Sequence, residues 1–342
     1  MNQDYAICTY PFNSAQISMQ GEVFVCCPPW CRSYSFGNIY EQSFDEIWNG
    51  ERAKEFRRQF INKDYKYCDL NLCIKDCAQN ITPTEVVDKP ETFIFCYDAT
   101  CNVKCIFCRS CHHNQDLTYF DEHMDEIIED MLPNAKNVVL SGVGECLASP
   151  HSRKLIKKIS ERFPDIKFSL ISNGILCDRK NLEELGIIDK LISITISLHA
   201  IKKETYDKLV VAGNFNKVID NLHFLSELKK EGKLDKFILN FVVTSHNYKE
   251  MADYVKFAEK IGATVGFLEL LRMDANEFVY NDINVFDKNH PKHNDFIKTL
   301  QNPIFKSGSC TINETMLNMK PQSMFTIFFA KIKSIFTNKS RV

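Results

Sequence analysis

The sequence predicts an α/β fold, in which six strand–helix units form a partial (β/α)6 TIM-like barrel after a small cysteine-rich α+β domain. Between residues 91 and 285, near-continuous apolar runs are separated by helical stretches, a pattern typical of a parallel sheet covered by helices. Six units are too few to close an eight-unit barrel. Before residue 88 the chain is rich in cysteine and its patterns are short. We therefore expect three parts, which are 1–88, 91–285 and a C-terminal extension, 286–342.

Composition excludes several classes of protein. The chain has 342 residues, of which 44% are hydrophobic and 25% charged, as in ordinary globular proteins. A net charge of −2 does not indicate binding to nucleic acid. The N-terminus has no basic region followed by an apolar run, and no stretch of about 18 apolar residues occurs, so we expect a cytoplasmic protein without a spanning helix.

Cysteine is the unusual component, with 15 residues, of which twelve form two groups, one before residue 78 and one from Cys96 to Cys111. Disulfides fit poorly in a long chain that lacks a secretion signal and can build its own core. Thiolates select zinc or iron–sulfur clusters. The cysteines therefore predict metal or cluster binding.

In the N-terminal part, the alternation in AQISMQGEVFVCC, with Gly21 at its middle, predicts a β-hairpin. The stretch SFDEIWNGERAKEFRRQFI has helical apolar spacing and predicts a helix. A cysteine-bearing loop, YCDLNLCIKDC, and a proline-flanked linker, ITPTEVVDKP, follow.

The second part is predicted to contain six parallel strands. They are TFIFCYD, NVVLSGVG, IKFSLISNG, LISITISLH, FILNFVVTS and TVGFLELL. The helices expected between them are DEHMDEIIEDML, HSRKLIKKISERF, RKNLEELG, FNKVIDNLHFLSELKKEG and EMADYVKFAEKIG. In such folds the functional residues lie at the carboxyl ends of the strands.

The tail from about residue 285 is less regular. Within MFTIFFAKIKSIF, a helix would carry one apolar stripe with two lysines beside it. Such a helix either packs on the barrel or lies on a membrane surface.

Three cysteines follow the first of these strands at a Cys-x3-Cys-x2-Cys spacing, namely Cys101, Cys105 and Cys108. Three thiolates of one loop can hold three corners of a four-iron cluster. The fourth iron then lacks a protein ligand, as a catalytic metal requires. The alternative is a zinc site completed by Cys96, Cys111 or His112.

This triplet, with Phe107 before its last cysteine, resembles the signature of the radical S-adenosylmethionine (SAM) superfamily, over roughly residues 92–275. The resemblance implies a barrel of the radical SAM type, a SAM-binding [4Fe–4S] cluster and SAM itself as cofactors. It assigns no role to Cys111, His112 or His113.

Further motifs agree with the resemblance. Gly142, Gly144 and Glu145 match the family's Gly-x-Gly-Glu at strand two, where the carboxylate would pair with the methionine ammonium, although Cys146 replaces the usual proline. The polar residues expected to contact the cofactor at strands three to five are Ser172, Asn173, Ser197 and Asn240. His199 replaces the acid usual after strand four, and either faces the substrate or completes the barrel rim.

The N-terminal spacing Cys8-x12-Gly21-x4-Cys26 resembles the opening of a SPASM domain, an auxiliary iron–sulfur module that usually follows the barrel. The resemblance implies a second [4Fe–4S] cluster. Its expected ligands are Cys8, Cys26, Cys68 and Cys73, with Cys27, Cys31 and Cys77 as alternates. Two alternatives remain, which are a zinc ribbon and a further auxiliary cluster.

The resemblance implies reductive cleavage of SAM to a 5′-deoxyadenosyl radical, which abstracts hydrogen from a peptide side chain or a sugar-type metabolite. The expected partners are that peptide or small-molecule substrate, an electron donor such as flavodoxin or ferredoxin, and a peptide-presenting protein. The alternative is a non-catalytic iron–sulfur electron carrier or cluster scaffold, which would have no use for Glu145, Ser172 and Ser197.

Overall fold

A computed structural model describes residues 8–18, 20–69, 87–108, 116–140, 143–272, 276–312, 314–317 and 319. The chain divides into two compact units. The first contains Met1–Asn102, His112–Ile194 and Glu231–Asp235, and the second contains Val103–Cys111, Thr195–Lys230 and Lys236–Val342. The strand β8 (Leu191–Ser197) begins in the first unit and ends in the second.

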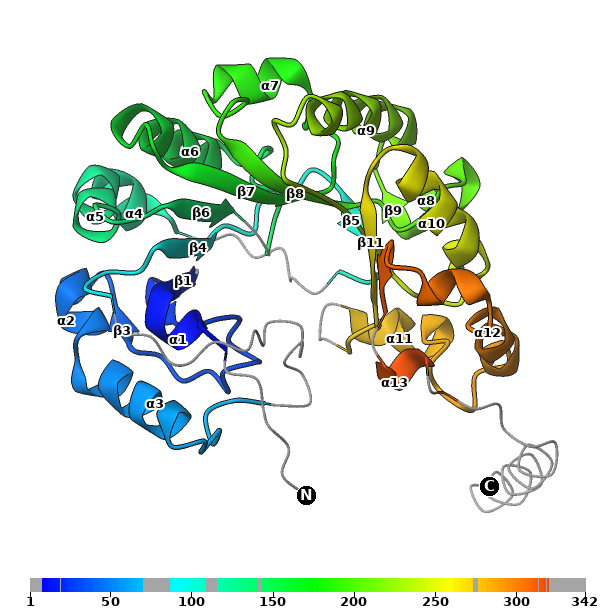
Figure 1. The fold of residues 1–342 in the computed structure, drawn as a ribbon, viewed down its shortest axis with the longest axis horizontal. Coiled ribbons are helices and arrows are strands. Elements are labelled where there is room, and N and C mark those ends of the chain that lie inside the picture. The colour runs from blue at the N-terminus through cyan, green and yellow to red at the C-terminus, as the bar shows by residue number, and fades with distance from the viewer. Residues whose placement is uncertain are drawn as a thin grey trace. The chain divides into compact units, whose positions relative to one another are not determined.

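The first unit is built on a mostly parallel sheet in the order β7-β6-β4-β1-β2-β3 (Figure 1). Its strands are β1 (Ser14–Ser18), β2 (Glu22–Phe24), β3 (Gly37–Asn38), β4 (Thr92–Cys96), β6 (Asn137–Leu140) and β7 (Lys167–Ser172). The N-terminal strand β1 pairs with β4 in parallel, from Ser14 opposite Thr92 to Ser18 opposite Cys96. The cysteine-rich segment therefore contributes strands to the same sheet as the first β/α units.

The predicted hairpin around Gly21 is confirmed, since β1 pairs with β2 in antiparallel fashion. Gly21 has a φ of +78° and its N–H donates to the Ser18 carbonyl at 3.2 Å. A Cβ atom at Gly21 would lie 2.6 Å from the Tyr40 ring. Glycine is required here both by the left-handed backbone and by the aromatic ring packed against it.

The helices α4 (Thr118–Glu122), α5 (Met124–Met131), α6 (Pro150–Arg162) and α7 (Arg179–Glu184) lie on the outer side of β4, β6 and β7 in the first unit (Figure 1). The N-terminal segment adds α1 (Tyr10–Asn13), which contacts β1 and α3, together with α2 (Phe44–Trp48) and α3 (Glu51–Ile61). Two stretches predicted as single helices are each divided in two. Gly50 is the N-cap of α3, and His123 lies between α4 and α5.

The second unit contains the parallel strands β10 (Lys236–Val242), β11 (Thr264–Leu268) and β12 (Cys310–Thr311), paired in that order. A separate antiparallel pair joins β5 (Lys104–Cys105) to β9 (Val210–Val211). Its helices are α8 (Lys203–Leu209), α9 (Phe215–Lys230), α10 (Met251–Lys260), α11 (Glu277–Ile283), α12 (His293–Thr299) and α13 (Glu314–Leu317), with 3₁₀ turns at Tyr248–Glu250 and Pro303–Lys306.

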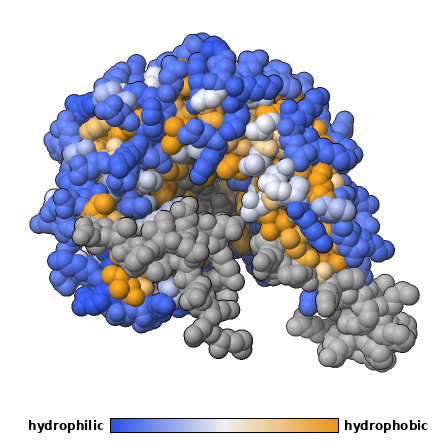
Figure 2. Space-filling view, in the orientation of Figure 1, coloured by the Kyte–Doolittle hydropathy of each residue, from blue (hydrophilic) through white to orange (hydrophobic). Residues whose placement is uncertain are grey.

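All six strands predicted for the second part of the sequence are present, as β4, β6, β7, β8, β10 and β11. In β4, β6, β10 and β11, fully buried residues alternate with half-buried ones along much of the strand. One face of these strands is therefore packed and the other only partly covered. Hydrophilic side chains cover most of the described surface seen in Figure 2.

Several sequence-predicted residues lie outside the described part of the chain. They are Cys73, Cys77, Cys111, His112, His113, Gly142 and the C-terminal stretch MFTIFFAKIKSIF. None of the described helices is long and apolar enough to cross a membrane.

Candidate functional site

The loop before Cys101 is fixed at the carboxyl end of β4 by Asp98. One Asp98 oxygen accepts the Thr100 N–H at 2.8 Å, and the other accepts the hydroxyl of Ser149. Ser149 is the N-cap of α6 and accepts the Ser152 N–H at 3.0 Å. Asp98 thus joins the chain entering the cysteine loop to the start of α6.

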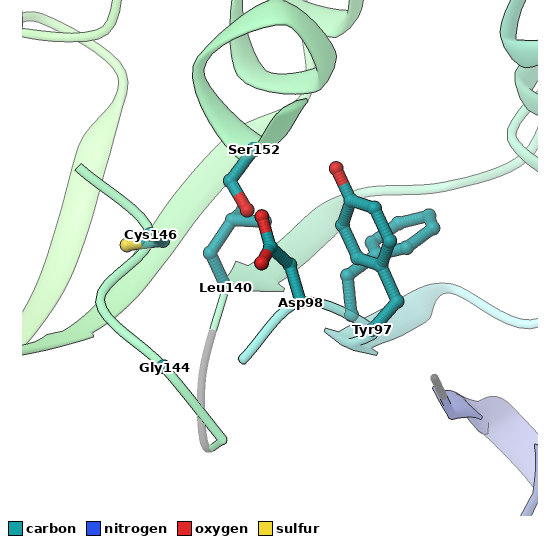
Figure 3. A pocket seen from close by; sticks show the side chains of 7 residues that line it. Tyr97, Asp98, Leu140, Gly144, Cys146 and Ser152 are labelled. Atoms are coloured by element: carbon teal, nitrogen blue, oxygen red, sulfur yellow. The ribbon is translucent and has the colours of Figure 1, made fainter. Parts of the chain in front are cut away.

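A small cavity lies beside Asp98, lined by Tyr97, Leu140, Gly144 and Ser152 among others (Figure 3). Its size is about that of one water molecule. The Tyr97 hydroxyl is buried without a hydrogen-bond partner among the described residues. A site of this size suits an ordered water and is too small for a substrate.

Gly144 and Glu145 follow β6 and pack on the loop after β4. A Cβ atom at Gly144 would lie 2.4 Å from the Thr100 carbonyl oxygen and 2.7 Å from that of Asp98. The Glu145 N–H donates to the same Thr100 oxygen at 2.7 Å. Glycine at 144 therefore allows two backbone segments to approach each other closely.

The carboxylate of Glu145 is buried, with 2% of the residue exposed. It accepts the Leu147 N–H at 3.2 Å, the Asn173 N–H at 2.6 Å and the Ser172 hydroxyl at 2.9 and 3.0 Å. Burial raises the pKa of Glu145, and these hydrogen bonds partly oppose the rise. An ionised carboxylate has about four acceptor positions. Three donors among the described residues occupy three of these positions, so the carboxylate can accept one more hydrogen bond.

Ser172 and Asn173, at the end of β7, complete this network. The Ser172 oxygen accepts the Gly174 N–H at 3.0 Å and the Cys177 thiol at 3.2 Å while its proton is shared with Glu145. The Asn173 amide donates to the side-chain oxygen of Asn102 at 2.7 Å, next to Cys101. The predicted cluster of Glu145, Ser172 and Asn173 therefore forms one hydrogen-bonded group.

Cys105 and Cys108 lie in the second unit, where the β5–β9 pair holds their loop. Cys105 is opposite Val210, and the Ile106 N–H donates to the Leu209 carbonyl at 3.0 Å. The Cys108 N–H donates to the Cys105 carbonyl at 3.0 Å, which closes a tight turn. Both thiols are half-buried, as is that of Cys101 in the first unit.

Phe107 is buried and packs edge-on against His199, with ring centroids 4.8 Å apart. His199 Nδ1 accepts the Val242 N–H at 3.1 Å, which leaves the neutral ring protonated on Nε2. The backbone of His199 is left-handed, with a φ of 62°. These contacts support a role at the rim for His199.

Ser197 and Asn240 are both half-buried in the second unit. A Cβ atom at Gly266 of β11 would lie 2.8 Å from the Asn240 side-chain oxygen, so this amide lies across Gly266. The Asn240 carbonyl accepts the Tyr254 hydroxyl at 3.0 Å.

A second group of thiols gathers in the N-terminal segment. A hydrogen bond with Cys31, followed by burial, raises the pKa of Cys26, and the nearby thiols of Cys8 and Cys68 add to this rise. The same hydrogen bond lowers the pKa of Cys31, against the effect of burial. Cys8, Cys31 and Cys68 therefore all lie close enough to Cys26 to influence its thiol. Of the predicted alternates, Cys31 donates its thiol proton to the Cys26 carbonyl at 3.6 Å, and the Cys27 carbonyl accepts the Cys26 thiol at 3.9 Å.

Comparison with known families agrees with these features. A family model described as an iron–sulfur cluster-binding domain, SPASM, matches residues 8–78, and one for the radical SAM superfamily matches residues 99–258. The chain therefore contains a SPASM domain and a radical SAM domain.

Curated relatives of the radical SAM chain include the probable GTP 3′,8-cyclase of Methanocaldococcus jannaschii. It is 28% identical over 189 residues, which cover 53% of this chain and 60% of the relative. The FeMo cofactor biosynthesis protein NifB of Methanocaldococcus infernus is 28% identical over 125 residues, which cover 32% of this chain and 40% of the relative. The matches thus span between 40% and 60% of these two relatives.

A solved structure similar to the radical SAM chain is that of Streptococcus suis SuiB bound to precursor peptide SuiA. It has 12% sequence identity, covers 92% of this chain and 73% of that chain, and gives a TM-score of 0.48.

The α/β fold of the radical SAM type that the sequence predicts is confirmed, with a mostly parallel sheet.

The radical SAM domain implies a [4Fe–4S] cluster and SAM, and the SPASM domain implies an auxiliary iron–sulfur cluster. The donor chemistry fits both, because soft thiolates hold iron–sulfur clusters. Within the described residues, no three Cys, His, Asp or Glu side chains stand in an arrangement that would hold a single metal ion.

Sequence reasoning missed two polar residues of the radical SAM chain. Asp98 lies two residues beyond the end of β4 and is not among the predicted site residues, although its place at a strand's carboxyl end is a usable signal. Tyr206, on α8 near Cys105, has a buried hydroxyl without a partner among the described residues. No motif or spacing distinguishes it.

Proposed function

We propose that this chain is a radical SAM enzyme that cleaves SAM reductively and abstracts hydrogen from a carbon of its substrate. The main support is the order in which the cysteines and the polar residues occur along the chain. Cys101, Cys105 and Cys108 follow β4, Glu145 follows β6, and Ser172 is the last residue of β7, the next strand of the same sheet. These cysteines would hold a cluster whose reduced form would supply one electron to the sulfonium of SAM, so that the C5′–S bond would break to methionine and the 5′-deoxyadenosyl radical.

The chain's own residues would prepare this reaction by binding and orientation. The Glu145 carboxylate can accept one more hydrogen bond. An ammonium group is a better donor to a buried carboxylate than a neutral group is. Ser172 and the Asn173 N–H hold that carboxylate in place. Phe107 is fixed by His199 on one side, and its carbonyl accepts the Asn276 amide at 3.4 Å. Ser197 and Asn240 remain proposed contacts to the cofactor.

The N-terminal thiols are proposed to hold the auxiliary cluster. The proposed ligands are Cys8, Cys26, Cys68 and Cys73, with Cys27, Cys31 and Cys77 as alternates. The electrostatic proximity of Cys8, Cys26 and Cys68 supports this set. A backbone hydrogen bond also joins the neighbours of Cys68 and Cys31, because the Asp69 N–H donates to the Trp30 carbonyl at 2.8 Å.

The proposed substrate is a peptide side chain or a sugar-type metabolite. The precursor peptide bound to SuiB and the GTP for which the cyclases are named are examples of the two classes. The proposed partners are an electron donor such as flavodoxin or ferredoxin and a peptide-presenting protein.

The test is anaerobic reconstitution with iron and sulfide, followed by dithionite and SAM, with chromatographic detection of 5′-deoxyadenosine. The wild-type chain should form it and Cys105→Ala should not. Cys310→Ala is the matched control, since Cys310 is also half-buried but lies on β12. Formation of the nucleoside by Cys105→Ala would overturn the proposal. A loaded wild-type protein that forms none would favour an electron carrier instead.

A further inference from the structure

Tyr206 lies on α8, in the same unit as the loop that carries Cys105 and Cys108. The residue has 0% of its surface exposed. Its hydroxyl is buried and has no hydrogen-bond partner among the described residues. A buried hydroxyl without a partner destabilises the folded chain, unless a group bound beside it accepts its proton.

The turn after α8 holds the Tyr206 ring closely. A Cβ atom at Gly213 would lie 2.6 Å from a ring carbon of Tyr206, 2.7 Å from its hydroxyl oxygen and 2.9 Å from the Val210 carbonyl oxygen. The Gly213 N–H donates to that Val210 carbonyl at 3.1 Å, and Ala212 between them has a φ of 62°. The hydroxyl therefore lies beside Val210, in a turn that only glycine at position 213 can make so tight.

Val210 is the residue opposite Cys105 in the β5–β9 pair. Side chains of directly opposite residues in an antiparallel pair lie on the same face. Val210 is buried, whereas Lys104 and Val211, which form the next pair, are exposed. The Cys105 side chain therefore points to the inner face, where the Tyr206 hydroxyl also lies.

Two further observations agree with this placement. Burial is the main cause that raises the pKa of Tyr206, and the nearby Cys105 thiol is the next. The backbone N–H of Asn214 also approaches the hydroxyl oxygen and acts against this rise. That approach uses the oxygen as an acceptor, and leaves the O–H proton to be donated.

We propose that the Tyr206 hydroxyl donates a hydrogen bond to the sulfur of Cys105 when that cysteine holds the SAM-binding cluster, and so sets the cluster's reduction potential. The inference rests on the proposed function. The proton stays on the tyrosine oxygen throughout. A hydrogen bond to a thiolate sulfur stabilises the state with one more negative charge, so it favours reduction. Tyr206 is thus a positioning residue that makes the cluster easier to reduce.

The test is an anaerobic potentiometric titration of the reconstituted full chain, followed by electron paramagnetic resonance. The signal that changes when SAM is added identifies the SAM-binding cluster, and the auxiliary cluster is the internal reference. Tyr206→Phe should lower the midpoint potential of the SAM-binding cluster. At a fixed potential, its ratio of reduced to oxidised cluster should fall about three-fold or more, while the reference stays unchanged.

Tyr248→Phe is the matched control, because it also removes a hydroxyl from a buried tyrosine of the same unit, one bonded to Asp295 at 2.6 Å. It should leave both potentials unchanged. Replacement of Tyr206 by 3-fluorotyrosine keeps the hydroxyl and makes it a stronger donor, so it should raise the potential. If Tyr206→Phe fails to fold, the fluorotyrosine protein still tests the proposal.

The outcomes separate the two proposals. A wild-type chain with no SAM-sensitive cluster would refute the proposed function. A SAM-sensitive cluster whose potential is the same in the wild type, Tyr206→Phe and the fluorotyrosine protein would refute the role of Tyr206 alone. A shift of both clusters by the same amount would also refute it, because the effect would then be a general change of the fold.

Discussion

At the carboxyl end of β6, a single buried carboxylate connects three segments of the first unit. Glu145 bonds to its own turn through Leu147, to β7 through Ser172, and to the following loop through Asn173. The same carboxylate is the proposed partner of the SAM ammonium. Glu145 therefore has both a structural and a proposed binding role, and a useful variant must distinguish them.

Glu145→Gln should weaken SAM binding about ten-fold to a hundred-fold, because a hydrogen bond to a charged group is worth about 1.5–3 kcal/mol. Anaerobic calorimetry measures this affinity. Ser172→Ala removes a donor but keeps the charge, so it should lower the melting temperature and affect SAM binding less. Unchanged affinity in Glu145→Gln would contradict the assignment. Loss of the cluster spectrum would show that Glu145 holds the loop instead.

Burial raises the pKa of Glu145 above its ordinary value of 4.5. The folded chain then keeps a proton at pH values where the unfolded chain has lost it. The free energy of unfolding should therefore fall as the pH rises from about 4.5 through the raised pKa, and then level off. Urea unfolding across this range should show the fall in the wild type and not in Glu145→Gln. A pH-independent difference between the two proteins would argue against a raised pKa.

At the scale of elements, α3 is tied to the segment after Cys8 by a buried guanidinium. Arg57 is 4% exposed, and donates to the Pro11 carbonyl and the Trp48 carbonyl, both at 2.8 Å. The guanidinium lies 4.0 Å from the centre of the Trp48 ring, and burial lowers the pKa of Arg57 to about 10. This residue joins α1, α2 and α3 into one group.

Arg57→Met should lower the free energy of unfolding by about 2–5 kcal/mol, because two buried carbonyl oxygens lose their donor. Denaturant unfolding followed by tryptophan fluorescence measures the change. Arg58→Met is the control, since Arg58 is exposed and pairs with Glu55 on the surface, and it should change stability by less than about 0.5 kcal/mol. Equal effects of the two substitutions would contradict the role of Arg57.

The sequence predicts strands correctly where the pattern of apolar residues is long enough to show a period. Each of the six predicted strands has at least four apolar or β-branched residues, and each was found. The two-residue strands β5 and β9 are too short for any period to be visible, and their pairing depends on α8 bringing Val210 to Cys105. The parallel pairing of β1 with β4 is set by tertiary packing, which a local pattern does not contain.

The candidate site divides in the same way. Cys101, Cys105, Cys108 and Glu145 belong to motifs, so a single sequence suffices to select them. Tyr206 and Arg57 are typical helical residues by their local spacing. Their burial, and the absence of a partner for the Tyr206 hydroxyl among the described residues, exist only in the folded chain.

At the scale of the whole molecule, two four-iron clusters should give about eight iron atoms per chain. Cys26→Ala should retain about four, because Cys26 lies among the N-terminal thiols. Elemental analysis of anaerobically reconstituted protein measures this content, with Cys310→Ala as the variant that keeps about eight. About four iron atoms in the wild type would remove the auxiliary cluster. Zinc in its place would support a ribbon.

The pairing of β1 with β4 has a consequence for synthesis. Residues Ser14–Ser18 leave the ribosome well before their partners Thr92–Cys96, so this edge of β1 waits unpaired while the SPASM-matching residues emerge. An unpaired strand edge is a template for another chain. A fragment that ends at residue 78 would keep this edge permanently, and would tend to aggregate. The cysteine-rich segment therefore completes its folding only after the first strand of the radical SAM domain has been made.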